Sequence, residues 1–248
     1  MLTAHRKQLL LERLRKDGRI VAKDLSTELD LSEDTIRRDL RELASEGLLQ
    51  RVHGGALPAS PTVANLDARR GMATDEKRRL GARAASLVAR SQRVFIDGGT
   101  TNLELVRSLP LDLAATIITH SPAIAAALEP HHAVEVIVIG GKLFRHSMVT
   151  VGAAALEAIG RLHIDLSFIG VTGLHPQEGA TTGDFEEAAI KRAVITRSAE
   201  TVLLVTSEKI GAVSAYSVCA LGELTAVIVP RQAQSDGFAS MDLELIRA

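Results

Sequence analysis

Cysteines, tryptophans and long apolar runs are scarce or missing in this chain of 248 residues. A single cysteine, Cys219, excludes an internal disulfide framework, and no cluster of cysteine and histidine has the spacing of a zinc site. No apolar run reaches the roughly 18 residues of a membrane span, and no basic segment precedes a short apolar one as in a signal peptide. We therefore expect a cytoplasmic protein without a bound metal or cofactor.

Aromatic residues are also rare, at 2% of the chain, so the core has to be built from leucine, valine, isoleucine and alanine. The overall fractions, 46% hydrophobic and 24% charged, are ordinary for a globular protein. Cys219 stands in a mostly apolar run, which favours a small core residue over a nucleophile.

An excess of positive charge is missing too. The first 57 residues hold 11 lysines and arginines against 10 aspartates and glutamates, and the whole chain has a net charge of −1. Bulk charge therefore gives no argument for a nucleic-acid partner, and only the local placement of arginines can.

The segment from Ser32 to Gly47 predicts a well-delimited amphipathic helix. Ile36, Leu40 and Leu43 are spaced as one apolar stripe. Ser32 is a favourable N-cap, and Gly47 suits the residue just after a helix end.

Polar and basic side chains occupy the other face of this helix. Thr35, Arg38 and Arg41 point away from the apolar stripe, and Arg37 lies on its flank. Arginines on a helix are often only a solvated face. The neighbouring segments decide between that interpretation and a surface for a negatively charged partner.

These neighbours predict a helix-turn-helix followed by a wing. A first helix is expected over residues 6–16, and the spacing of Val21, Leu25 and Leu29 predicts a second short helix directly before Ser32. The segment after Gly47 is expected to run as a strand and to turn at residues 54–55, beside the basic helix. Such a helix fits a DNA major groove, where arginine binds guanine or phosphate with two hydrogen bonds. The alternative is a helical bundle whose arginines serve solubility.

The stretches "GRIVAKDLSTELDLSEDTIRRDL" and "TIRRDLRELASEGLLQRVHGGA" closely resemble the signature of the DeoR family of bacterial transcriptional regulators. In that family this helix reads operator DNA. The resemblance, which spans residues 1–56, implies a DNA-contacting set made of Ser32, Thr35, Arg37, Arg38, Arg41, Arg51 and His53.

The chain is expected to divide into a winged helix-turn-helix domain (residues 1–57), a linker (58–75) and a larger α/β domain (76–248). Short apolar, β-branched runs begin at residues 93, 114, 134, 165, 201 and 224, and stretches of helical length separate most of them. This alternation predicts a Rossmann-like, largely parallel sheet with both faces covered.

Polar loops follow the first three of these strands, at the sheet edge where such folds bind ligands. The loops comprise Asp97, Gly98, Gly99, Thr100 and Thr101; then Thr119, His120 and Ser121; and then Gly140, Gly141 and Lys142. Glycines and a helix N-terminus favour an anion. Because no dinucleotide or P-loop pattern occurs, we expect a small polyhydroxylated anion instead.

The second half of the chain resembles the effector domain of the DeoR family in "FIDGGTT", "IGGKLFRHSMVTVGAAA", "DLSFIGVTGL" and "GDFEEAAIKRAVITRSAETVLLVTSEKIG". The resemblance implies a fold related to sugar-phosphate isomerases and a response to phosphorylated sugars or related phosphates. It also implies that Glu187, Lys191 and Lys209 face the Asp97–Thr101 loop across the ligand. The chain departs from the family pattern at His120, where Asn is usual, and at Thr206 and Pro230, where Asp is common.

The resemblance therefore implies a DNA-binding repressor of a carbohydrate-metabolism operon that a phosphorylated sugar releases from its operator. The rival hypothesis is an enzyme, a sugar-phosphate isomerase joined to a DNA-binding head, with Glu187 as base and Lys209 as electrophile. We expect no enzymatic activity, because simple binding needs the same residues. The expected partners are double-stranded operator DNA, a small phosphorylated metabolite and further copies of the chain. Repressor and activator, and dimer and tetramer, remain open alternatives.

Overall fold

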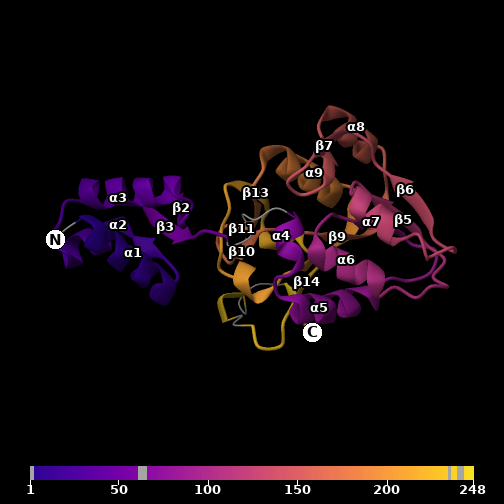
Figure 1. The fold of residues 1–248 in the computed structure, drawn as a ribbon, viewed down its shortest axis with the longest axis horizontal. Helices are drawn as coiled ribbons and strands as arrows, with labels where there is room; N and C mark the ends of the chain where they lie inside the picture. Colours follow the sequence, from indigo (N-terminus) through magenta and orange to yellow (C-terminus); the bar gives the residue numbers. More distant parts are fainter. Residues whose placement is uncertain (1–2, 61–65, 234–235, 239–242) are drawn as a thin grey trace.

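Two bodies joined by one crossing of the chain make up the computed structural model, which describes residues 3–60, 66–233, 236–238 and 243–248. Figure 1 shows the smaller, N-terminal body at the left and the larger α/β body at the right. Among the described residues, no helix combines the length and the apolar character needed to cross a membrane.

The N-terminal body is the predicted winged helix-turn-helix. Its core holds the stripe of Ile36, Leu40 and Leu43 together with Leu10 and Leu14. Its strands form an antiparallel sheet in the order β1-β3-β2. The elements are α1 (Thr3–Asp17), β1 (Ile20–Val21), α2 (Ala22–Glu28), α3 (Glu33–Ser45), β2 (Leu49–Val52) and β3 (Gly55–Pro58).

One prediction in this body is wrong. Val21 was expected in the second helix, but it lies in strand β1, pairs with Gly55 and is exposed. Strand pairing replaces the helix here because Gly55 has no side chain and can approach Ile20 closely. A Cβ at residue 55 would collide with the carbonyl oxygen of Ile20. The wing turn accordingly lies at His53 and Gly54, with a φ of 80° at Gly54.

The larger body is built on a seven-stranded sheet in the order β15-β14-β12-β9-β4-β5-β6, in which every neighbouring pair is parallel. All six predicted strands are confirmed within this sheet. Its strands are β4 (Arg93–Ile96), β5 (Thr116–Thr119), β6 (Glu135–Val138), β9 (Ile164–Ile169), β12 (Ser198–Leu204), β14 (Ala226–Val229) and β15 (Glu244–Arg247).

Helices cover both faces of this sheet, as a doubly wound fold requires. Val94 and Ile96 of β4 pack in one core, whereas Phe95 between them packs in the other. The first core also holds residues of α5 (Thr74–Ala85), α6 (Thr100–Arg107) and α7 (Pro122–Ala127), and the second holds residues of α8 (Ala153–Gly160) and α9 (Phe185–Thr196). Figure 1 shows α8 and α9 on the upper side, away from α5.

Several short elements were not predicted. Elements this short carry too little periodicity to be predicted from the sequence. They are β7 (Lys142–Phe144), β8 (Val149–Val151), β10 (Gly173–His175), β11 (Gly179–Thr182), β13 (Tyr216–Cys219) and the 3-10 turns at Ser207–Lys209, Leu221–Glu223 and Asp236–Phe238. The predicted linker contains a helix, α4 (Leu66–Arg70), and its residues 61–65 lie outside the described part of the chain.

A buried ion pair connects α1 to α3 in the DNA-binding body. The guanidinium of Arg6 donates two hydrogen bonds to the Asp39 carboxylate, one of them 3.1 Å long, and both side chains are almost fully buried. Removing one member of such a pair leaves an uncompensated charge in the core.

We therefore expect Asp39→Ala to destabilise this body by about 3–5 kcal/mol, because Arg6 stays buried without its partner. Hydrogen exchange of α1 and α3 peptides, followed by mass spectrometry, measures the change. The double variant Arg6→Met/Asp39→Leu should recover most of the protection, because an apolar pair needs no charge compensation.

The matched control is Lys7→Ala, which removes partly exposed ion pairs to Glu42 and Glu46 on the same two helices. Such pairs contribute about 0.2–1 kcal/mol, so exchange should change little. Unchanged exchange in Asp39→Ala would contradict a structural role for the buried pair.

Candidate functional site

The exposed side of α3 presents the arginines that the sequence assigns to DNA. Arg37 forms an ion pair of 2.6 Å with Glu33, and Arg41 donates a hydrogen bond of 3.4 Å to the carbonyl of Arg37. Arg38 is exposed and has no hydrogen bond or ion pair to any described residue. Arg38 is therefore the cation of this helix most available to a partner.

The start of α3 is fixed as its sequence predicts. The Ser32 hydroxyl accepts a hydrogen bond of 3.2 Å from the Thr35 amide, and the two hydroxyl oxygens are 2.8 Å apart. Arg51 on β2 and His53 in the wing turn are both exposed. All seven predicted DNA contacts thus lie on α3, its cap and the wing, and all except the half-buried Thr35 are exposed.

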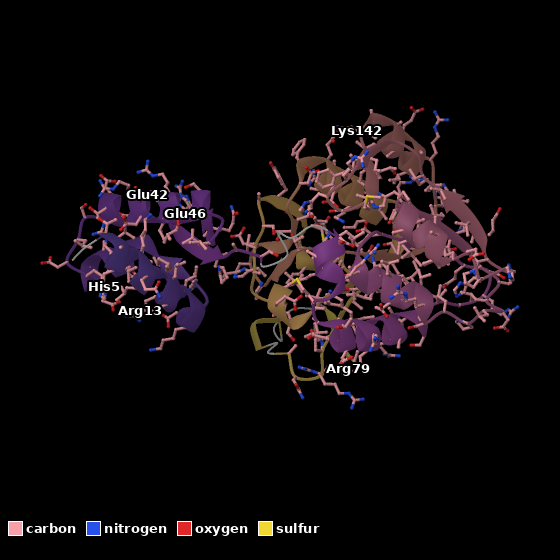
Figure 2. The ribbon with its side chains drawn as sticks, in the orientation of Figure 1. His5, Arg13, Glu42, Glu46, Arg79 and Lys142 are labelled. Carbon is pink, nitrogen blue, oxygen red and sulfur yellow. The ribbon has the colours of Figure 1, made fainter. Side chains whose placement is uncertain are left out.

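Two acidic side chains near the end of α3 form ion pairs with α1. Glu42 and Glu46 lie along the upper side of α3 in Figure 2, and both form ion pairs with Lys7 of α1, at 3.0 and 3.2 Å. These two glutamates connect α3 to α1, whereas Glu33 pairs with Arg37 on α3 itself. Arg38 remains the arginine of this helix without a partner among the described residues.

The second candidate site is a cavity at the carboxyl ends of β4, β9 and β12, the edge where parallel sheets bind ligands. It measures about 40 Å³, room for about three water molecules. Its wall comes from six segments: Arg69, Met72 and Lys77; Gly98, Gly99, Thr100, Thr101 and Asn102; Ser147; Gly170, Val171 and Thr172; Thr182, Glu187 and Lys191; and Leu204, Glu208 and Lys209.

The N-terminus of α6 opens onto this cavity. Gly99 has a φ of 117°, a conformation that favours glycine, and this lets the chain turn from β4 into the helix. The first amides of a helix have no partner within the helix, and those of Thr100 and Thr101 bond to no other described residue. Free amides and the positive end of the helix dipole make this wall suited to an anion.

Four cations line the cavity, and only Lys191 forms an ion pair with another described residue. Lys191 forms an ion pair of 2.5 Å with Asp97, and the ammonium of Lys77 donates hydrogen bonds to the carbonyls of Arg69 and Met72. In contrast, neither Lys209 nor Arg69 forms an ion pair with any described residue. These two side chains therefore remain without a direct ion-pair partner, although the charge of Glu187 acts on Arg69 and that of Glu208 acts on Lys209.

Burial perturbs both of these cations. It lowers the pKa of Lys209 to about 8, and the neighbouring charge of Arg69 adds to the effect. Burial also lowers the pKa of Arg69, whose Nε is enclosed without a hydrogen-bond partner. An anion placed between them would relieve both penalties.

Asp97 does not face a ligand as the family resemblance implies. Its carboxylate is buried and accepts hydrogen bonds from the amides of Gly98 (2.7 Å) and Gly170 (2.9 Å), from His120 (2.6 Å) and from Lys191 (2.5 Å). With its oxygens occupied, Asp97 holds the site together and is not available for binding.

The second predicted loop lies beneath the cavity instead of at its rim. Thr119, His120 and Ser121 are completely buried. Their side chains hold neighbouring segments: the Thr119 hydroxyl donates to Ile96, His120 bonds to Asp97 and to the carbonyl of Thr150, and the Ser121 hydroxyl donates to Met148. The polar pattern reflects support of the site, because all these groups are satisfied within the protein.

The third predicted loop, at Gly140 and Gly141, does not line the cavity. Lys142 already belongs to β7, which pairs with β8, and only the turn of this hairpin reaches the cavity, through Ser147. The Lys142 side chain is 77% exposed, forms an ion pair of 3.6 Å with Glu186 and lies at the upper edge of the molecule in Figure 2. This loop is therefore not brought together with the other two.

Of the predicted effector residues, the structure brings seven to the cavity wall: Gly98, Gly99, Thr100, Thr101, Glu187, Lys191 and Lys209. Sequence reasoning missed Arg69, Lys77, Asn102, Ser147 and Glu208. Asn102 directly follows the quoted glycine-threonine loop, and its position was a usable signal. Its Oδ1 is buried without a partner while its amide nitrogen donates to Asp97, which leaves an acceptor for a ligand hydroxyl.

The chemistry of the cavity suits binding. Glu187 accepts a hydrogen bond of 3.2 Å from Ser147, and the Thr206 hydroxyl donates to Glu208 at 2.7 Å. No group of three potential metal-binding residues occurs in the described ranges. Burial raises the pKa of the Cys219 thiol to about 12, as fits a core residue and not a nucleophile.

Comparison with known proteins extends these observations. The profile described as "DeoR-like helix-turn-helix domain" matches residues 6–62, and the profile described as "DeoR C terminal sensor domain" matches residues 72–231. Among solved structures, ribose 5-phosphate isomerase A of Methanocaldococcus jannaschii aligns over 55% of this chain and 54% of its own, with a TM-score of 0.41 and 15% identity.

Three curated relatives are similar over most of their length. The regulator GlpR of Haloferax volcanii is 35% identical, with 95% of this chain and 93% of the relative covered. The repressor GlcR of Bacillus subtilis is 30% identical, with 96% and 93% covered, and the glycerol-3-phosphate regulon repressor of Escherichia coli is 30% identical, with 82% and 81% covered. All three names describe regulators of transcription. The chain belongs to the DeoR family of DNA-binding transcriptional regulators.

Proposed function

We propose that this regulator represses a carbohydrate-metabolism operon and that a phosphorylated sugar or related phosphate releases it from its operator. The cavity carries the proposal, because Lys209 and Arg69 stand there without anionic partners beside the open amides of α6. A phosphate needs this combination of charge and directed N–H donors.

The names of two relatives support this proposal. One of them is named as repressor of the glycerol-3-phosphate regulon and another as a putative repressor of the aga operon. Double-stranded DNA as a partner follows from the family, whereas the effector, the operon and the cytoplasmic location are parts of this proposal.

The geometry does not favour the rival isomerase. A general base needs a second group that holds it against the substrate, and Glu187 has only the hydroxyl of Ser147. The curated relatives are transcriptional regulators, and function has to be argued from the site and not from a shared fold.

The arginines of α3 are expected to determine DNA affinity. Arg38→Ala should weaken binding to DNA selected from a random duplex pool by about 1–3 kcal/mol if the side chain reads a base, or reduce the salt slope by about one if it contacts phosphate. Fluorescence anisotropy at several salt concentrations measures both. Lys16→Ala, on α1, is the control, and an Arg38→Ala/Arg41→Ala double variant with wild-type binding would exclude this face.

The effector is expected to release DNA in a pH-dependent way. A panel of glycerol 3-phosphate, glucose 6-phosphate and fructose 1-phosphate should contain a releasing ligand, whereas the unphosphorylated compounds should have no effect. Affinity should fall as the pH rises through about 8, since Lys209 then loses its proton while the phosphate, with a second pKa of about 6, stays a dianion. Calorimetry at pH 7 to 9.5 measures this profile.

Two variants of Lys209 test whether its charge or only its shape determines the affinity for the effector. Lys209→Met should lower the affinity about 10- to 100-fold, as expected for loss of a charge-assisted hydrogen bond. Lys209→Arg should bind with little dependence on pH, because arginine stays protonated. No release by any phosphorylated compound would contradict the proposed function, and a pH-independent wild-type affinity would exclude Lys209 as a ligand contact.

A homo-oligomer with two or more DNA-binding heads completes the proposal, since a single head has a net charge of only +1. Strand β6 supports this oligomer, because it lies at an edge of the sheet and bears the exposed side chains of Val136, Ile137 and Val138. The amides of Glu135 and Ile139 point to β5, so by alternation those of Val136 and Val138 point to the open side. An open, apolar edge is suited to pair with the same strand of a second copy.

Val138→Lys is expected to weaken self-association, because a lysine on an edge strand opposes pairing. Sedimentation at micromolar concentration should show an oligomer for the wild type and a smaller species for the variant. Leu111→Lys, at an equally exposed position away from β6, is the control. A wild type that is strictly monomeric, free and on DNA, would exclude the oligomer, and an unchanged variant would exclude this edge.

A further inference from the structure

Arg69, a wall residue of the cavity, does not belong to the sheet domain in sequence. It lies on α4, in the segment that connects the wing strand β3 with α5. Its Nε is enclosed without a partner, and it forms no ion pair with any described residue. The linker between the two bodies therefore contributes an unneutralised cation to the candidate effector site.

Several contacts fix the backbone of α4 to the larger body. Lys77 donates hydrogen bonds of 2.7 and 2.5 Å to the carbonyls of Arg69 and Met72, at the end of the helix where a cation is favourable. The amide of Leu66 donates to His146 at 2.9 Å, and the Leu66 side chain is buried. The position of α4 thus depends on groups that surround the cavity.

The beginning of the linker is attached to the same neighbourhood. The Val213 amide donates to the carbonyl of Pro58, the last residue of β3, at 3.1 Å, and the Ser60 amide donates to the Val213 carbonyl at 3.3 Å. The Ser60 hydroxyl donates to the carbonyl of Thr172, a wall residue. Because Val213 follows Lys209 by four residues, the wing is bonded to the chain that carries the other unpaired cation.

A second cavity adjoins the first on the side of the DNA-binding body. It measures about 340 Å³, within the usual range for a small-molecule site. The two cavities share Arg69, Ser147, Thr172 and Glu187, and the second is also lined by Ala44, Gly47 and Gln50 of the DNA-binding body. The smaller cavity lies far below the usual range for a small-molecule site, so most of a ligand bound there has to extend past this shared wall.

We propose that Arg69 binds the phosphate of the effector and that this contact, made by the linker itself, transmits effector binding to the DNA-binding heads. The inference rests on the proposed function and names the residue through which it works. A ligand that draws Arg69 toward the amides of α6 shifts α4 and with it the attachment of β3. The equilibrium between two positions of the DNA-binding heads then shifts, and the size of the shift is set by the difference in the ligand's affinity for these two positions.

The experiment separates affinity from coupling by measuring DNA affinity at saturating effector. The probe is the panel compound with the strongest effect, and its binding is measured by calorimetry. Lys209→Met should bind this compound about 10- to 100-fold more weakly, yet release DNA as fully as the wild type once saturated. Arg69→Met should bind it more weakly and also retain most of its DNA affinity at saturation.

Two further variants serve as controls. Arg70→Met changes the exposed neighbour of Arg69, whose ion pair with Asp67 is 3.5 Å long, and should behave as the wild type. Arg69→Lys keeps the charge and should restore part of the coupling. Full release from a saturated Arg69→Met variant would overturn the inference while leaving the proposed function intact.

Inorganic phosphate distinguishes the remaining outcomes. If the wild type binds phosphate and Arg69→Met does not, but no panel compound releases DNA, the anion site is retained while the proposed function and the coupling both fail. If Arg69→Met binds phosphate as the wild type does, Arg69 is not a ligand contact and the inference fails regardless of the DNA result.

Discussion

The candidate effector site depends on one buried carboxylate, that of Asp97. It accepts hydrogen bonds from the Gly170 amide, from His120 and from Lys191, and so joins the ends of β4, β5 and β9 to α9. Burial alone would raise the pKa of Asp97, but the charge of Lys191 and the hydrogen bond from His120 outweigh burial and hold it well below its usual range. An ionised carboxylate in a dry interior needs these partners, because removing one partner of a buried ion pair costs about 3–5 kcal/mol.

The same pairing decides which cations remain for a ligand. Lys191 is neutralised by Asp97, and burial that would lower the pKa of Lys191 is overcome by that carboxylate. Lys209 has no such partner, and its pKa falls to about 8. The acidic side chains of the wall, Glu187 and Glu208, each accept a hydrogen bond from a neighbouring hydroxyl. The cavity is therefore assembled by one internal ion pair, and the cations outside this pair are those to which the proposed anion would bind.

The sequence predicts this fold well where the signal is local and fails where partners are distant. The stripe that includes Ile36 and the apolar β-branched strands are visible because burial imposes a period on neighbouring residues. The glycines before Lys142 have the composition of a ligand loop, but strand pairing with β8 directs them elsewhere. The departure from the family pattern at His120 marks a partner for Asp97, 23 residues away, and no local pattern reports such a pair. Arg69 was missed because its segment has the composition of a linker, and only the folded chain places it in the cavity wall.

The small net charge of the DNA-binding body sets the energy scale of the switch. With 11 basic and 10 acidic residues, a head gains affinity from a few placed arginines such as Arg38 and not from its overall field. In the proposed oligomer, DNA binding that is built on few contacts and on more than one head responds steeply to the spacing of the heads. A coupling energy of about 1–3 kcal/mol, equivalent to about 5- to 150-fold in affinity, is then sufficient for release. A ligand that engages the linker, as proposed, supplies such a change without touching α3, because only residues 59–65 separate the wing strand β3 from the helix that carries Arg69.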